Sequence, residues 1–302
     1  MAESSSSLVL PQKSDAEMEE MLDRMLTRLA LCDDSKLQNL LSKLLPLSIS
    51  SLSSHSPAVR NKVIEILSHV NKRVKHQPEI GLPLSELWKL YMEAEAAPMV
   101  KNFCIVYIEM AFERTSEEEK QKMAPALVAN ISKLPLQHQE IILRISVKLG
   151  ASSSWRFWSE EGGGVIGDCH SSRINDEVAA KYSFPGAQDR EIFVEFCLHT
   201  VLYQPPSQGG GCPAGLSVTQ SNRITGKHPL KYDKLLIMKL GILNVIEAMD
   251  LALELVYPLY VAACADCQEP VVKRGEELLK KKASGVNLDD TTLINRLFLL
   301  FN

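Results

Sequence analysis

Two cysteines near the C-terminal end have a spacing that can bind a metal or form a redox pair. Cys264 and Cys267 form a single C-x-x-C, which supplies two of the four ligands of a structural zinc site. No second pair of ligands lies near them in the sequence, and a thioredoxin-like pair needs a βαβ setting. We therefore predict that Cys264 is a buried core cysteine, and a metal or redox role remains the alternative.

The other candidates for chemistry lie in segments rich in serine and glycine. Asp168, Cys169 and His170 could suggest a nucleophile with a base, but adjacent side chains point in different directions along a chain. The glycine runs at 162–164 and 209–211 are not followed by the Lys-Ser/Thr of a phosphate-binding loop. The seven histidines are scattered, without the spacing of a metal site. The sequence thus predicts no catalytic, cofactor-binding or metal-binding residue, and no enzyme.

Basic side chains offer a different kind of chemistry, the binding of an acidic protein surface. Five of them lie on the polar face of one segment with helical periodicity: Arg60, Lys62, Lys72, Arg73 and Lys75. Such a face is most often a solvated surface, and contact with a partner through electrostatic steering and rim ion pairs is the alternative. We keep these five residues as candidate protein contacts.

The segment that carries these residues, 46–75, has the pattern of a helical hairpin. In its second half, apolar residues recur at helical spacing: Val59, Val63, Ile66, Leu67, Val70 and Val74. Ser56 can cap this helix, and Pro57 suits its first position, where a missing N–H costs nothing. The hairpin cannot bury its apolar stripe alone, so it must stack on others, and its pattern resembles the HEAT repeat.

A second copy of this hairpin lies near the C-terminal end and reads LYVAACADCQEPVVKRGEELLKK. The alignment places Pro258 on Pro46 and Val271 on Val59, in one register. Internal similarity of this kind indicates an α-solenoid. The same alignment places Cys264 opposite a leucine of the first copy, which supports the prediction of a core position.

Length and composition narrow the class of protein. The chain has 302 residues, of which 45% are hydrophobic, enough for a continuous core of stacked hairpins. Its net charge of -4 disfavours the binding of nucleic acid. Seven cysteines, an odd number at irregular spacing, are typical of reduced thiols in an intracellular protein. No apolar window reaches the roughly 20 residues that cross a bilayer, so we expect a soluble protein without a transmembrane segment.

These patterns predict an all-α fold, an α-solenoid of HEAT-like helical hairpins with two low-complexity loops. The apolar run 101–112 could suit a strand by its β-branched content, but no second strand is available to pair with it, so we predict a helix buried between layers. The last apolar run, 293–301, ends abruptly, and we expect the chain to be part of a longer array. The expected organisation is a disordered start at 1–13, HEAT-like repeats at 14–150, a Ser/Gly-rich loop or insertion at 151–186, a helix at 187–203, a flexible linker at 204–229 and HEAT-like repeats at 230–302.

Four blocks carry a more specific resemblance. They read LQNLLSKLLPLSISSLSSHSPAVRNKVIEILSHVNKRVK, HQPEIGLPLSELW, VKNFCIVYIEMAFER and EEEKQKMAPALVANIS, in this order. In their order and wording they resemble the N-terminal region of the HEAT-repeat proteasome adaptor and scaffold protein family. The resemblance covers about 14–302 and is strongest over 33–135. The family protein is several times longer, and the segment around 155–176 does not match its pattern.

The resemblance implies a non-catalytic scaffold without cofactors. Its partners would be subunits of the proteasome core and regulatory particles, which it would bridge or stabilise, together with other recruited proteins. The expected location is the cytoplasm and the nucleus. The alternative is a HEAT-type nuclear-transport receptor, or another HEAT-repeat protein-binding scaffold. Such receptors are strongly acidic, whereas this chain carries a net charge of only -4. Binding of a basic localisation peptide or a small GTPase would favour the alternative.

Overall fold

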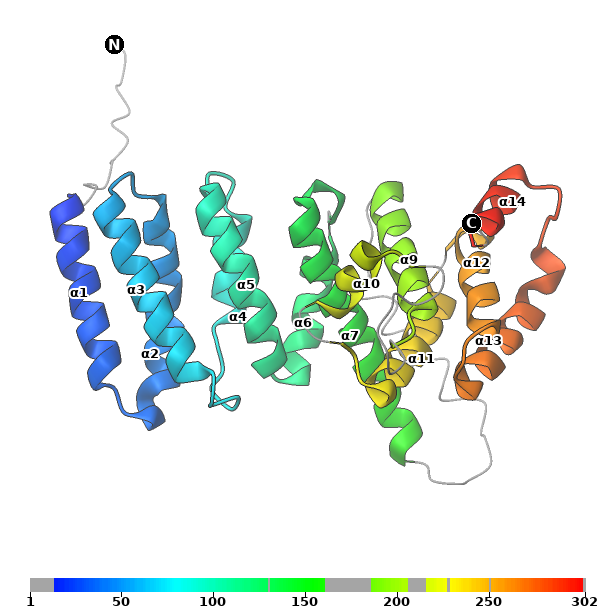
Figure 1. Ribbon diagram of the computed structural model, residues 1–302, viewed down its shortest axis with the longest axis horizontal. Helices are drawn as coiled ribbons and strands as arrows, with labels where there is room; N and C mark the ends of the chain where they lie inside the picture. The colour runs from blue at the N-terminus through cyan, green and yellow to red at the C-terminus, as the bar shows by residue number, and fades with distance from the viewer. Residues whose placement is uncertain are drawn as a thin grey trace, which may run out of the picture. The chain divides into compact units, whose positions relative to one another are not determined.

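The computed structural model describes residues 14–129, 131–160, 186–205, 216–226, 229–249 and 251–300. Within these ranges every regular element is a helix, and no strand is present (Figure 1). The all-α prediction is therefore confirmed. The chain divides into two compact units, unit 1 (Met1–Ser116) and unit 2 (Glu117–Asn302).

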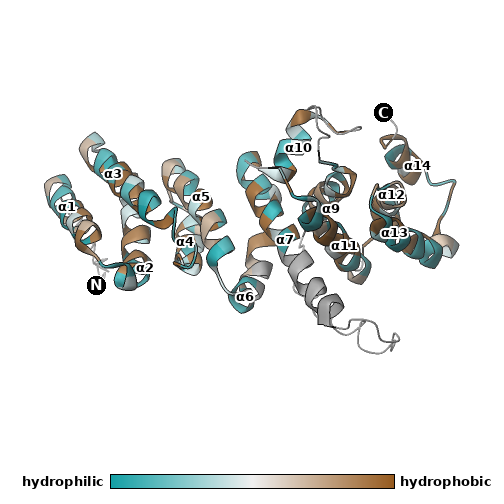
Figure 2. Cartoon of the chain, turned by 60° about the horizontal axis from the view of Figure 1, so that its bottom comes forward, coloured by the Kyte–Doolittle hydropathy of each residue, from teal (hydrophilic) through white to brown (hydrophobic). Residues whose placement is uncertain are grey.

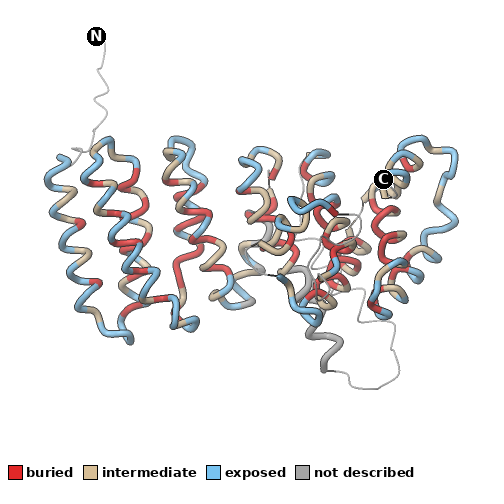
Figure 3. The backbone as a smooth tube through the Cα atoms, in the orientation of Figure 1, coloured by how far each residue is buried: buried red, intermediate tan, exposed pale blue. Residues whose placement is uncertain are grey.

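Unit 1 consists of helices joined by short connections (Figure 1). In order they are α1 (Asp15–Leu31), α2 (Asp34–Ser50), η1 (Ser51–Ser53), α3 (Pro57–Val74), α4 (Leu84–Met92) and α5 (Pro98–Arg114). Helix α3 packs against α1 and α2, and α5 packs against α4 and α2. The buried positions lie on the facing sides of these helices (Figure 3). The unit is thus a set of stacked helical hairpins, as the HEAT-like pattern predicts.

The sequence signals at the start of α3 act as predicted. The Ser56 Oγ accepts a hydrogen bond of 3.4 Å from the Val59 N–H, and Pro57 is the first helical residue. All six apolar residues of the predicted stripe are buried: Val59, Val63, Ile66, Leu67, Val70 and Val74. Burial of such a side chain is worth about 1.5–3 kcal/mol relative to exposure. Packing of this stripe, more than helix propensity, therefore holds α3 in place.

The apolar run at 101–112 forms part of α5, so the prediction of a helix is confirmed, but the helix is not buried on all sides because Val106 is 47% exposed. Its buried side chains include Cys104 and Ile108. The Tyr107 hydroxyl donates a hydrogen bond of 2.9 Å to Asn71 Oδ1, which fastens α5 to α3. The β-branched residues do not make this run a strand, because packing against neighbouring helices stabilises the helix.

Unit 2 contains the remaining helices. In order they are α6 (Glu117–Val128), η2 (Ile131–Lys133), α7 (Leu136–Glu160), α9 (Ala187–Leu202), α10 (Val218–Thr225), α11 (Tyr232–Ala248), α12 (Leu253–Cys264), α13 (Glu269–Lys282), η3 (Ala283–Gly285) and α14 (Thr291–Phe298). Helix α11 packs against α7 and α13, and α12 packs against α9, α13 and α14. Helices α12 and α13 form the hairpin whose sequence repeats that of α2 and α3. Both hydrophilic and hydrophobic turns are visible along α13 (Figure 2).

Two boundaries in unit 2 differ from the predicted organisation. Helix α7 continues to Glu160, past the predicted start of a loop at 151, because a single glycine costs a long helix only about 1 kcal/mol. Helix α10 lies inside the predicted flexible linker. Ser217 and Gln220 form a reciprocal capping box at its start, which satisfies two backbone donors of a short helix. The low-complexity composition of these segments therefore concealed ordered helical residues.

The division between the units falls after Ser116, whereas the sequence suggested a change in organisation near residue 150. The predicted disordered start at 1–13 lies outside the described residues, as do 161–185, 206–215 and 227–228 of the two predicted loops. Across the described ranges, no helix is both long enough and apolar enough to cross a membrane.

Candidate protein-contact site

The five predicted contact residues all lie on or directly after α3, and Arg73 among them is bound within unit 1. Arg73 donates two hydrogen bonds, each of 2.9 Å, to the carbonyl oxygens of Leu29 and Cys32 at the end of α1. It also forms an ion pair with Asp34 at the start of α2, and this contact lowers the pKa of the Asp34 carboxyl. The end of a helix leaves carbonyl groups without partners inside the helix. Arg73 satisfies such groups and is a structural residue of the α1–α2 turn.

Lys62 and Arg60 are engaged in a similar way. The Lys62 ammonium lies 2.9 Å from the Asp23 carboxylate of α1 and 3.1 Å from the Glu65 carboxylate of α3. The hydrogen bond with Asp23, followed by that with Glu65, raises the pKa of Lys62. Arg60 donates a hydrogen bond of 2.8 Å to the carbonyl oxygen of Ser54, in the turn before α3. Both side chains therefore help to position α3 against its neighbours.

Lys72 and Lys75, here called the α3 lysines, differ from the other three. Both are exposed, and neither forms an ion pair or a side-chain hydrogen bond with any residue that the structure describes. A partner could bind these two ammonium groups without breaking a contact inside unit 1. The helical periodicity of the sequence does not separate these two lysines from the three bound residues. Lys62 and Arg73 lie about three turns apart on the edge of α3 that faces α1, and only the position of α1 shows that this edge is occupied.

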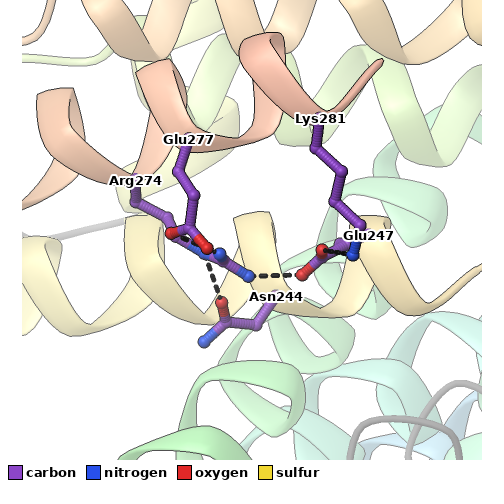
Figure 4. A network of polar contacts seen from close by, with 5 residues as sticks. All are labelled: Asn244, Glu247, Arg274, Glu277 and Lys281. Atoms are coloured by element: carbon purple, nitrogen blue, oxygen red, sulfur yellow. Dashed lines mark hydrogen bonds and ion pairs between the residues drawn. The ribbon is translucent and has the colours of Figure 1, made fainter. Parts of the chain in front are cut away.

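Unit 2 contains a denser polar network between α11 and α13 (Figure 4). Arg274 of α13 donates to Asn244 Oδ1 at 3.0 Å and forms an ion pair with Glu247, both on α11. Arg274 also lies 2.7 Å from Glu277, and Lys281 lies 2.7 Å from the second oxygen of Glu247. Burial by itself would raise the pKa of Glu247, but Lys281 and Arg274 outweigh burial, so the pKa is lowered. Glu247 therefore stays ionised at neutral pH, with a cation on each oxygen.

A pocket with a volume of about 270 Å³, here called the α13 pocket, lies next to this network. Its inner wall includes Ile246 of α11 together with Val256 and Tyr260 of α12, and all three are buried. Its rim includes Lys282 and Ser284, at the end of α13 and in η3. Burial raises the pKa of Tyr260, so its hydroxyl keeps a proton that it can donate. No local sequence pattern indicated this pocket, because its wall and its rim come from separate helices.

The C-x-x-C pair does not occupy the core position that the sequence predicted. Cys264 is only partly buried and Cys267 is exposed, so the prediction of a buried core cysteine was wrong. Between them, the side chain of Asp266 is buried and forms an ion pair with the buried Lys239 of α11. The alignment misled at this position because α12 ends at Cys264, whereas the aligned Leu52 lies inside η1 and is buried.

Metal and nucleophile candidates add no site to those above. No group of three or more His, Cys, Asp or Glu side chains within the described ranges is placed to hold a metal ion. The motif at 168–170 and the glycine runs at 162–164 and 209–211 lie outside the described residues. The α3 lysines in unit 1 and the α13 pocket in unit 2 are thus two features that the described residues offer to a partner molecule.

Comparisons with known proteins find relatives along most of the chain. Residues 22–302 match a family model described as "Proteasome component ECM29, N-terminal". The human "Proteasome adapter and scaffold protein ECM29" is 27% identical over 292 residues, which are 93% of this chain and 16% of the human protein. The Drosophila melanogaster "Proteasome-associated protein ECM29 homolog" is 33% identical over 116 residues, which are 38% of this chain and 6% of that protein. The Schizosaccharomyces pombe "Proteasome component ecm29" is 28% identical over 123 residues, which are 40% of this chain and 7% of that protein.

The chain spans only a small part of the length of these curated relatives, 16% in the case of the human protein. In the other direction, the family model covers well over half of the chain, from residue 22 to residue 302. The chain therefore belongs to the family described as proteasome component ECM29, N-terminal.

Proposed function

We propose that this chain is a non-catalytic scaffold element that associates with the proteasome. The observation that carries the proposal is the family match over residues 22–302. The names of the relatives agree with it, since the human relative is a proteasome adapter and scaffold protein. In this role the chain would help to bridge or stabilise the core and regulatory particles and would recruit other factors. It would act in the cytoplasm and the nucleus.

Stacked helical hairpins suit such a role. Each hairpin buries one side of its helices and leaves the opposite side to water or to a partner. Each further hairpin extends the surface without closing the structure. Binding through such a surface rests on shape, apolar contact and charge, and it needs no reactive side chain.

We assign partner contact in unit 1 to the α3 lysines, Lys72 and Lys75. The other three predicted contact residues, Arg60, Lys62 and Arg73, are already bound inside unit 1. An acidic partner surface would gain electrostatic steering and rim ion pairs from the two free ammonium groups. Substitution of the three bound residues would instead change the stability of unit 1.

Affinity purification of the tagged 302-residue chain from cells of its source organism tests the scaffold proposal. Quantitative mass spectrometry of the co-purifying proteins should show subunits of both the core and the regulatory particle, enriched over a tag-only control. Recovery of neither particle would contradict an association of this chain with the proteasome.

Paired charge reversals test the assigned contact. Lys72→Glu combined with Lys75→Glu should lower the recovery of proteasome subunits several-fold, because rim charges change steering and reversed charges add repulsion. Lys36→Glu combined with Lys43→Glu makes the same change in net charge at exposed positions of α2 and should have little effect. Equal losses from the two pairs would reveal a general charge effect and would remove the α3 lysines from the contact site.

A further inference from the structure

The α13 pocket is lined by a hydrogen-bond donor that has no acceptor among the described residues. Tyr260 is 1% exposed and lines the pocket, yet its hydroxyl forms no hydrogen bond with any described residue. The hydroxyl oxygen is not among the buried atoms that lack a partner, so it opens to the pocket, where a bound acceptor can take its hydrogen bond in place of water. A tyrosine hydroxyl is protonated at neutral pH, so a ligand that accepts a hydrogen bond would complement it.

The rim of the pocket carries more positive than negative charge. Lys282, the last residue of α13, is exposed and has no ion pair with any described residue. Lys281 binds Glu247 through one N–H, and its ammonium has further N–H groups for a ligand. Glu247 is the one carboxylate among the described lining residues, and Lys281 and Arg274 occupy its two oxygens. The pocket therefore offers donors and positive charge, and its carboxylate is already neutralised.

The same pocket is small, and apolar side chains are among its lining residues. Ile246 and Val256, which are 1% and 3% exposed, line it together with Leu253. Its volume of about 270 Å³ lies just below the roughly 300–1,000 Å³ of pockets that hold drug-sized ligands. The space therefore suits a single residue better than an extended segment. A matching ligand combines an apolar side chain and a carboxylate within one residue.

We propose that the α13 pocket binds the C-terminal residue of a partner protein. The apolar side chain of that residue packs against Ile246 and Val256, and its α-carboxylate accepts hydrogen bonds from Lys282 and the Tyr260 hydroxyl. The last residue of a chain is the place where an apolar side chain and a carboxylate share one Cα. It also enters a small pocket end-on, whereas an internal segment would have to cross the rim twice. Charge-assisted hydrogen bonds of this kind are among the strong ones in proteins.

Fluorescence polarisation with the purified 302-residue chain tests the proposal without a proteasome. The probe is fluorescein-Gly-Ser-Gly-Ser-Leu with a free C-terminal carboxylate. The same peptide with a C-terminal amide loses the charge and one acceptor oxygen, and it should bind about tenfold more weakly. A free-acid peptide that ends in serine keeps the carboxylate and replaces the apolar side chain with a small polar one, and it should also bind about tenfold more weakly. A further control is an amidated peptide that contains Leu-Asp at an internal position. If it bound as tightly as the free acid, the assignment to a C-terminal residue would be wrong.

Variants of the chain locate the binding. Lys282→Gln should weaken binding of the free-acid probe about tenfold, and Tyr260→Phe should weaken it several-fold while it keeps the aromatic packing. Lys280→Gln is the matched control, because Lys280 is exposed on the same helix and does not line the pocket. Its affinity should equal that of the unchanged chain. Absence of binding up to about 1 mM probe, or equal loss in the two lysine variants, would refute the site. Neither result would bear on proteasome association, which is measured separately.

Discussion

The first hairpin, α2–α3, and the last, α12–α13, use the same pattern of ion pairs at aligned positions. Lys62 of α3 binds an aspartate of α1 and a glutamate of its own helix. Arg274, at the aligned position of α13, binds Glu247 of α11 and Glu277 of its own helix. In both hairpins one basic residue therefore joins the second helix to the helix that precedes the hairpin.

The turns of the two hairpins correspond as well. In the first, the Ser54 Oγ accepts the N–H of Ser56 at 3.0 Å and donates to Asp15 of α1 at 3.2 Å. In the last, one oxygen of Asp266 accepts the N–H two residues further on at 2.8 Å, and the other binds Lys239 of α11. Each turn thus contacts the helix that precedes its hairpin, and this is the same helix that the ion pair of that hairpin contacts.

The two hairpins differ in how much water reaches these contacts. The side chains of Lys62 and Asp23 are 28% and 59% exposed, whereas those of Arg274 and Glu247 are 19% and 16% exposed. The ion pair in the last turn is buried almost completely. Arginine offers five donors in a rigid fork, so at this drier position Arg274 binds Asn244 in addition to two carboxylates, whereas Lys62 binds two carboxylates. The repeat thus keeps the geometry of the contact and changes its chemistry with burial.

Removal of the buried charge in the last turn should have the largest effect on stability. Asp266→Asn leaves the Lys239 ammonium buried without its partner and should lower the free energy of unfolding by about 3–5 kcal/mol. Ser54→Ala is the aligned change in the first turn. It removes hydrogen bonds that are more exposed to water, and it should lower the free energy of unfolding by about 1 kcal/mol. Urea unfolding followed by circular dichroism measures both losses. Equal losses would mean that burial does not distinguish the two turns.

A change that forces α12 and α13 apart should have the next largest effect on stability. Gly275 is buried where α13 meets α12, at the position aligned with the buried Val63 of α3. A Cβ on Gly275 would lie 2.8 Å from the Ala263 Cβ and 3.0 Å from the Cys264 N. Gly275→Ala should therefore lower the free energy of unfolding by about 1–2 kcal/mol, because overpacking exceeds the gain in helix propensity.

The matched change in the first hairpin, Val63→Ala, should also destabilise the chain, in this case because it leaves a cavity. The same urea experiment compares the two. A Gly275→Ala variant that was more stable than the unchanged chain would show that α12 and α13 can move apart freely, and the close approach would then not be a constraint of the last hairpin.

The apolar sides of these helices could be predicted from the sequence. A helix that buries one side repeats apolar residues every three or four positions, and this spacing is visible in α3. The start of α3 at Ser56 and Pro57 follows from the backbone chemistry of capping. These features depend on residues a few positions apart, so a local reading of the chain is sufficient for them.

The polar contacts could not be assigned in the same way. Lys72 and Arg73 are neighbours with the same charge, but only Arg73 meets Asp34 and the end of α1, which are distant in the sequence. The α13 pocket likewise combines three helices that no local pattern brings together. Cys264 was misplaced because an alignment of apolar positions does not show where α12 ends. Whether a polar side chain in this fold is free or bound therefore depends on residues that are distant in the sequence.

Acid should separate the two hairpins by a smaller effect than the loss of the buried ion pair. Burial would raise the pKa of Glu247, but Lys281 and Arg274 hold it below its ordinary value of 4.5 in the folded chain. A carboxylate with a lowered pKa contributes stability that is present above the unfolded-state pKa and is lost as pH falls through the folded-state pKa. Glu247→Gln should therefore cost about 1.5 kcal/mol at neutral pH. The difference from the unchanged chain should shrink below about pH 4.5, as measured by urea unfolding across that range.

Asp23→Asn is the matched variant in the first hairpin, and salt distinguishes it from Glu247→Gln. At about 1 M salt the screening length falls to about 3 Å, which weakens exposed pairs far more than half-buried ones. High salt should therefore remove the effect of Asp23→Asn on unfolding and leave most of the effect of Glu247→Gln. If salt reduced both effects equally, water would reach the two ion pairs alike. Burial would then not explain why an arginine occupies this position in the last hairpin and a lysine in the first.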